Sequence, residues 1–251
     1  MSITFCTIVL VIICLGALLQ SAVGFGIALF STPLLVYLGM PLPQAIALVA
    51  TCSFFQSAMG AKSLSSTIPW KLTFTAIPVS SLFCIIGIFI LKWLSSLSPD
   101  DILFWIGAIL CLLVLLKITI KIRTYDKIHW GWGAIAFSLS GLISGICGMG
   151  GPPLVIWTLF HNWSVKKIRG FLFSVFMGGT PIYLIVLFLM FGNKILWSMA
   201  IGVMLFPAIL VGTFLGLYIG NRMSKKVLLI VAYSTLFIIG IKSVMPAILT
   251  F

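Results

Sequence analysis

The sequence predicts an all-α polytopic membrane protein made of two inverted repeats, each a broken, re-entrant helix pair followed by three transmembrane helices. Of its 251 residues, 62% are hydrophobic and only 7% are charged, and the mean hydropathy is +1.30. A soluble domain of this length has no core large enough to bury that much apolar surface. Several uncharged stretches reach the ~20 residues that span a bilayer, and no charged side chain precedes Lys62.

Two glycine clusters interrupt the apolar sequence. The first reads GFG at positions 24–26, and the second reads GMGGPP at positions 148–153, 124 positions later. Glycine loosens a helix and proline removes a backbone donor, so both residues interrupt helices. Inside a bilayer an interrupted helix is tolerated mainly where protein or a watery cavity covers it. Paired breaks in two halves of a membrane protein are typical of a transport site.

The apolar stretches set the order of the predicted elements. Residues 3–20 and 27–39 flank the first break, and residues 44–60, 71–94 and 101–122 follow it. Residues 131–147 and 152–160 flank the second break, and residues 168–191, 195–220 and 226–249 follow it. We expect a first membrane repeat at 1–122, a cytoplasmic linker at 123–130 and a second membrane repeat at 131–251. The apolar N-terminus lacks a basic n-region and a cleavage site, so we interpret it as a membrane segment.

Matching residues in the two halves support the repeat. Pro78 pairs with Pro207, Gly87 with Gly216 and Ser95 with Ser224, all 129 positions apart. The offset of 124 at the breaks then implies a short insertion in the second half.

The basic residues help decide how the broken pairs are threaded. If each pair is a hairpin that enters and leaves on one side, twelve of the fifteen Lys and Arg residues share one face. They are Lys62, Lys71, Lys117, Lys121, Arg123, Lys127, Lys166, Lys167, Arg169, Arg222, Lys225 and Lys226. Lys92, Lys194 and Lys242 remain for the other face.

A single kinked crossing at 130–160 splits the charges about evenly. The positive-inside rule favours the hairpin, with both termini outside the cytoplasm. Two full crossings per broken pair give the same parity, but residues 27–39 and 152–160 are shorter than a span.

The breaks also carry a family resemblance. The GFG cluster with Pro33-Leu34-Leu35 downstream resembles the first-half motif of the sulfite exporter TauE/SafE family of membrane permeases. The GMGGP cluster at 148–152 resembles the second-half motif, and the similarity covers nearly the whole chain. Ile27 and Ala28 stand where the family often has further glycines. The resemblance implies transport of small sulfur-containing anions such as sulfite or sulfonates.

The residues around the breaks have the chemistry to hold an anion. Helix N-termini carry free N–H groups and a partial positive charge, and glycine lets a substrate approach the backbone. Hydroxyls and amides complete the shell, and further nearby candidates are Thr32, Ser53 and Ser174. The predicted substrate-binding residues are Gln20, Ser21, Gly24, Phe25, Gly26, Ser31, Thr51, Gln56, Ser144, Gly148, Gly150, Gly151, Pro152 and Thr180. The alternative for any Ser or Thr is a hydrogen bond within its own helix or between helices.

Several functions are disfavoured by what the sequence lacks. The only carboxylates are Asp100, Asp101 and Asp126, all in predicted loops, so an intramembrane acid is not expected to couple transport. Arg169 and its neighbours Lys166 and Lys167 are expected to anchor at lipid headgroups. The six cysteines are scattered without metal-ligand spacing, so no metal or other cofactor is expected. The net charge of +12 fits cytoplasmic loops better than nucleic-acid binding.

The expected function is a permease or secondary transporter for small sulfur-containing anions, not an enzyme, because no nucleophile–base–acid set is present. The alternative is a membrane-embedded assembly or scaffold protein without transport activity. The expected location is the inner (plasma) membrane of a bacterium, with a small anion and the lipid bilayer as partners. The sequence sets no oligomeric state.

Overall fold

The computed structural model describes residues 3–96 and 129–224, together with isolated positions between 101 and 108 and between 227 and 234. Apart from these positions, the predicted segments 101–122 and 226–249 fall outside the described residues, as does most of the predicted linker 123–130. So do the basic residues Lys117, Lys121, Arg123, Lys127, Lys225, Lys226 and Lys242.

Every regular element in the described part is a helix. The first half contains α1 (Ile3–Val23), α2 (Ile27–Tyr37), α3 (Leu42–Ser63), a short 3-10 helix (Ser65–Thr67) and α4 (Trp70–Leu94). The second half contains α6 (Trp130–Cys147), α7 (Gly151–Leu159), α8 (Val165–Phe191), a 3-10 turn (Gly192–Ile195), α9 (Leu196–Met204) and α10 (Phe206–Gly220). The predicted all-α class is therefore confirmed for these residues.

Five helical stretches of the described chain are long and apolar enough to cross a membrane. They are Thr4–Val23, Leu42–Ser63, Trp70–Leu94, Trp130–Cys147 and Val165–Met204. By contrast, α2 has 11 residues and α7 has 9, which is shorter than the ~20 residues of a span. Each broken pair thus joins one arm of full length to one short arm.

The two breaks lie where the sequence predicts them, and glycine is required there. The backbone of Gly24 has φ of 101°, that of Gly26 has φ of 132°, and that of Gly148 has φ of 77°. Residues with a Cβ rarely adopt such values. Gly148 also ends α6 in the left-handed conformation, and its N–H donates to the Ser144 carbonyl at 2.7 Å.

The predicted continuous segment 195–220 is wrong, because it forms two helices that separate at Leu205. Pro207 lies in the first turn of α10, where a missing N–H is tolerated. Its counterpart Pro78 lies inside the continuous helix α4. The two halves therefore differ in their last helix.

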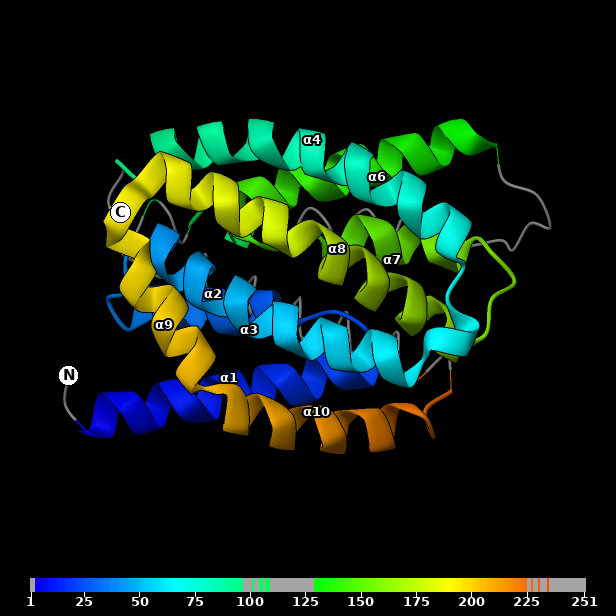
Figure 1. The fold of residues 1–251 in the computed structure, drawn as a ribbon, viewed down its shortest axis with the longest axis horizontal. Helices are drawn as coiled ribbons and strands as arrows, with labels where there is room; N and C mark the ends of the chain where they lie inside the picture. Colours follow the sequence, from blue (N-terminus) through cyan, green and yellow to red (C-terminus); the bar gives the residue numbers. More distant parts are fainter. Residues whose placement is uncertain are drawn as a thin grey trace.

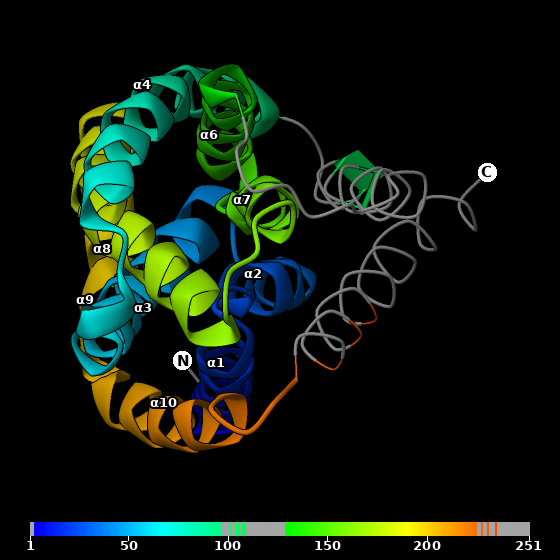
Figure 2. The same ribbon diagram turned by 90° about the vertical axis from the view of Figure 1, so that its right-hand side faces the viewer.

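Helices of one half pack mainly against helices of the other (Figures 1 and 2). α4 lies along α6, and α1 lies along α10, while α3 packs against α8. α4 also contacts α8, and α3 contacts α9. The contact of α4 with α6 thus matches that of α10 with α1, and the contact of α4 with α8 matches that of α9 with α3. This pattern is expected if α1–α4 correspond to α6–α10.

Glycines allow the closest of these contacts. A Cβ on Gly87 would overlap the carbonyl oxygen of Leu142, and a Cβ on Gly216 would overlap the carbonyl oxygen of Leu18. Leu18 and Leu142 are 124 positions apart, and the two glycines are 129 apart, which are the offsets of the sequence repeat. Small residues let membrane helices approach this closely. The same backbone contact thus joins α4 to α6 and α10 to α1.

The helix directions place the basic side chains at the ends of the bundle. In Figure 1, α3 runs toward the right-hand end and α8 runs away from it. Lys62 lies in the last turn of α3, and Lys166 and Lys167 lie in the first turn of α8, so these cations share one end. Lys92, in the last turn of α4, and Lys194, just after α8, lie toward the opposite end.

Candidate functional site

Both glycine breaks border one cavity of about 60 Å³, which is lined by residues of both halves. The predicted site residues that line it are Gln20, Phe25, Gly26, Ser144, Gly148, Gly150, Gly151 and Thr180. The structure therefore brings together residues more than a hundred positions apart, because α1, α2 and α3 meet α6, α7 and α8 at this point.

The Gln20 side chain bridges the first break. Its Oε1 accepts a hydrogen bond from the Ile27 backbone N–H at 3.2 Å, which satisfies the first donor of α2. Its Nε2 donates to the hydroxyls of Ser53 and Ser57 on α3, each at 3.2 Å. Gln20 is buried, so these bonds fix the end of α1, the start of α2 and the face of α3 relative to one another.

The second break is held by contacts of Gly150 and Gly151. The Ser140 hydroxyl of α6 donates to the Gly150 carbonyl at 2.6 Å. Gly151 packs under the ring of Phe25, and a Cβ there would lie 2.6 Å from a ring carbon. The two breaks are therefore in direct contact through Phe25, which is itself buried.

The two short helices offer unequal sets of backbone donors to the cavity. At the start of α2, Gln20 takes up the Ile27 N–H, but the N-cap residue Gly26 has no side chain and the first turn contains no proline, so further N–H groups stay available. α7 begins with Gly151, Pro152 and Pro153, and the two prolines have no N–H. Since an anion at a helix start is held by free N–H groups, α2 provides the better N-terminus of the two.

The cavity is lined mainly by apolar side chains and carries no charge. None of its lining residues is Asp, Glu, Lys, Arg or His. Its polar groups are hydroxyls, the Gln20 amide and the backbone of the glycines. An anion there would be held by dipoles and hydrogen bonds, without repulsion from a carboxylate.

Six predicted site residues lie outside the cavity lining: Ser21, Gly24, Ser31, Thr51, Gln56 and Pro152. The Gln56 amide donates to the Ser21 hydroxyl at 2.7 Å and to the Ala17 carbonyl. Ser31 donates to the Ile12 carbonyl at 3.4 Å, and Thr51 donates to the Ala47 carbonyl within its own helix at 2.8 Å. Thr180 lines the cavity, yet its hydroxyl also bonds its own helix, at the Phe176 carbonyl. The position of a polar residue near a break in the sequence therefore does not show whether its side chain faces the cavity.

Arg169 does not lie where a headgroup anchor would lie, and that prediction is wrong. The side chain is fully buried. Its Nη2 donates to the Ser21 carbonyl at 2.5 Å, and its Nη1 donates to Asn221 Oδ1 at 3.0 Å. Its Cα and Cγ pack against Gly24, where a side chain would leave no room. The cation thus caps the C-terminal end of α1, where the helix dipole is negative.

Three further side chains line the cavity: Thr32 and Ser53, which the sequence offered as nearby candidates, and Tyr183, which it did not. The Thr32 and Tyr183 hydroxyls are buried and have no hydrogen-bond partner, and the Tyr183 hydroxyl lies against Gly148. Thr32 and Ser53 could be identified as hydroxyls near the break, but their orientation could not. Tyr183 could have been suspected because a tyrosine in an apolar span needs a partner for its hydroxyl.

Comparison with known proteins agrees with this architecture. The family model described as sulfite exporter TauE/SafE matches residues 8–243 of the chain. No curated protein and no solved structure matches it. The match covers both breaks, the cavity and nearly all of the candidate membrane spans, so the chain is an integral membrane protein of a transporter family. The chain belongs to the sulfite exporter TauE/SafE family.

Proposed function

We propose that the protein is a permease or secondary transporter that moves small sulfur-containing anions, such as sulfite or sulfonates, across the inner membrane of a bacterium. The observation that carries this proposal is the uncharged cavity at which the two glycine breaks meet. Family membership supports the class of substrate. The anion would be held by the start of α2, by the glycine backbone and by the hydroxyls that line the cavity.

We further propose that the two halves are inverted repeats and that each broken pair is a re-entrant hairpin. In support, α3 and α8 run in opposite directions in Figure 1, as do α4 and α10. The packing of α4 on α6 and of α10 on α1, each around a glycine, supports the same relation. Such a relation lets the site open alternately to the two sides as one half rocks against the other.

The uncharged lining bears on how transport would be driven. No carboxylate borders the cavity to carry a proton or bind sodium. Transport would then run as uniport, or be coupled through protonation of the substrate itself or through ions bound by the backbone.

Thr32→Val tests the cavity as the anion site. The change keeps the shape of the side chain and removes the unpaired hydroxyl that the fold itself does not use. A hydrogen bond to a charged group contributes about 1.5–3 kcal/mol, so the affinity for sulfite should fall about tenfold or more. Equilibrium dialysis with labelled sulfite and flux into proteoliposomes measure the change.

Thr51→Val is the matched control, because it makes the same change on a buried hydroxyl that bonds its own helix. We expect its affinity and flux to stay close to those of the wild type. Equal affinities for the Thr32→Val variant and the wild type would contradict the assignment of this cavity as the site.

Cysteine labelling separates a permease from a scaffold without a pathway. In a background with the native cysteines replaced, Ser53→Cys should react with a small water-soluble thiol reagent, since Ser53 lines the cavity. Ser31→Cys should not react, because Ser31 is buried against the Ile12 carbonyl. An unreactive Ser53→Cys would favour the scaffold.

A further inference from the structure

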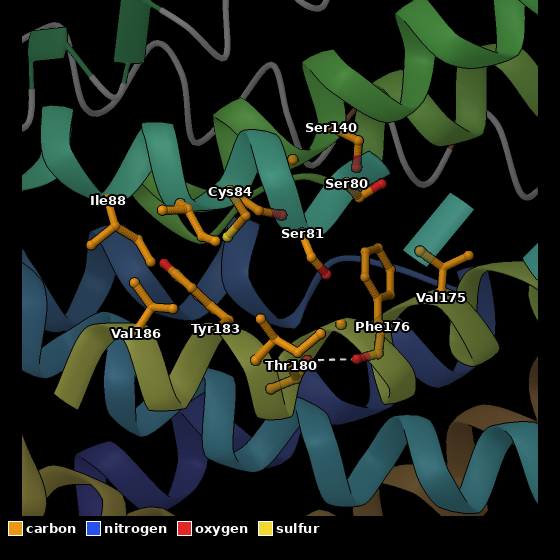
Figure 3. A pocket seen from close by; sticks show the side chains of 15 residues that line it. Ser80, Ser81, Cys84, Ile88, Ser140, Val175, Phe176, Thr180, Tyr183 and Val186 are labelled. Carbon is orange, nitrogen blue, oxygen red and sulfur yellow. Dashed lines mark hydrogen bonds between the residues drawn. The ribbon is translucent and has the colours of Figure 1, made fainter. Parts of the chain in front are cut away.

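A second cavity, of about 50 Å³, lies beside the candidate site, between α4, α6 and α8 (Figure 3). The two cavities share four lining residues, which are Ser144, Phe176, Thr180 and Tyr183. These four residues therefore form the boundary between the two cavities. No feature of the sequence indicated this second space.

The second cavity is lined by hydroxyls on all three helices. Ser80 and Ser81 project from α4, Ser140 from α6, and Thr180 and Tyr183 from α8 (Figure 3). Ser140 and Thr180 use their protons on backbone carbonyls. The hydroxyls of Ser80, Ser81 and Tyr183 are buried and have no partner, and the side chains of Ser81 and Tyr183 are only 9% and 7% exposed. Three free O–H donors therefore border this space.

The chemistry of this cavity fits a small oxyanion. Its lining contains no Asp, Glu, Lys, Arg or His, so neither repulsion nor a competing cation is present. Free hydroxyls can donate to the oxygens of an anion, and buried donors without a partner are otherwise unfavourable. A water needs about 10–15 Å³ measured in the same way, so the space admits one compact oxyanion or a few waters.

The repeat does not require these hydroxyls. The positions that correspond to Ser80 and Ser81 are Ile209 and Leu210, at the same offset of 129. Gln56 precedes Thr180 by the other offset of the repeat, 124 positions. Its amide donates to the Ser21 hydroxyl and the Ala17 carbonyl and so joins α3 to α1 in that half. The hydroxyls of Ser80 and Ser81 are thus not a by-product of duplication.

We propose that the hydroxyl cavity is a second station on the path of the transported oxyanion, which passes between α4, α6 and α8 on its way to or from the candidate site. The inference rests on the proposed function. Because two anions this close would repel each other strongly, the stations are occupied in turn. Tyr183 borders both cavities, and its hydroxyl can donate to the anion in either of them.

The test is the double variant Ser80→Ala, Ser81→Ala, which changes residues of the second cavity alone. We expect the maximal rate of sulfite flux in proteoliposomes to fall about tenfold, because the second station loses two donors. The affinity for sulfite measured by equilibrium dialysis should stay within about twofold, because the first station is intact. Thr75→Val is the matched control, since its exposed hydroxyl on α4 bonds only the Leu72 carbonyl.

Each other outcome overturns the inference. An unchanged maximal rate would mean that only water occupies the cavity. A fall in affinity by the same factor as in flux would make Ser80 and Ser81 part of the first station. A wild-type protein that neither binds nor moves sulfite would remove the proposed function itself, and that failure is visible before any variant is made. The melting temperature of the double variant shows whether it is folded.

Discussion

Arg169→Met is expected to lower the free energy of unfolding by about 2–3 kcal/mol, because two hydrogen bonds to a charged group are lost at a buried helix end. The side chain is among the largest that are fully buried in the described part of the chain. The expected readout is a lower melting temperature of the purified protein in detergent, together with a loss of sulfite flux.

The physical reason lies in what the substitution leaves behind. Replacing a whole buried ion pair by apolar residues is often neutral, since both charges leave together. Here the acceptors stay, and the Ser21 carbonyl at the end of α1 would be buried without a partner. Gln20 lies next to Ser21 in the sequence, and Gly24 is the first residue after α1. The first break would therefore lose its fixed position against α8. We therefore expect sulfite flux to be lost even at temperatures at which the variant is still folded.

Two further variants make this prediction sharp. Arg169→Lys keeps a cation but cannot fork to both the Ser21 carbonyl and Asn221, so it should recover only part of the stability. Lys166→Met removes an exposed cation from the same turn of α8 and should melt like the wild type. If the Arg169→Met protein melted and transported like the wild type, the buried guanidinium would have no role in holding the break.

Gly87→Ala is expected to destabilise the protein by about 3 kcal/mol, at the upper end of the usual cost of overpacking. The added Cβ would overlap the Leu142 carbonyl and approach the Gly145 Cα to 2.8 Å. These are backbone atoms, which cannot rotate away as a side chain can, so α4 and α6 must move apart. Gly216→Ala should have a similar effect on α10 and α1, since it overlaps the Leu18 carbonyl. Thermal unfolding in detergent measures both.

Gly133→Ala provides the matched control on α6. A Cβ at this position would meet its nearest neighbour, a Trp157 ring carbon, at 3.5 Å, which is an ordinary contact. Since alanine favours a helix over glycine, this variant should be as stable as the wild type or slightly more so. Equal melting temperatures for the Gly87→Ala and Gly133→Ala variants would show that the close approach of α4 and α6 contributes nothing to stability.

Much of the fold followed from local properties of the sequence. The membrane class came from composition, and the helix ends came from Gly24, Gly26, Gly148 and the prolines, because these residues act on their own stretch of backbone. The break at Leu205 was missed although Pro207 was visible, since prolines also occur inside the continuous helices α4 and α8. Whether a proline breaks a helix depends on the contacts around it, which composition does not reveal.

The sequence indicated where a cavity lies more clearly than which side chains line it. Both glycine clusters border the cavity, and so do Gln20 and Ser144. Ser31 and Thr32 are neighbours in the sequence, yet only Thr32 lines the cavity. A rotation of about 100° per residue separates their side chains, so the choice between them depends on how α2 packs.

The sequence by itself determined that this chain enters a membrane, where its helices are interrupted and to which family it belongs, because hydrophobicity and backbone freedom are properties of short segments. Only the tertiary structure decided which side chains face the cavities, that Arg169 is buried at the end of α1, and that Ser80, Ser81 and Tyr183 border a second cavity. The reason is that these features join residues distant in the chain, such as Ser21 and Arg169, whose separation of 148 positions leaves no pattern along the sequence.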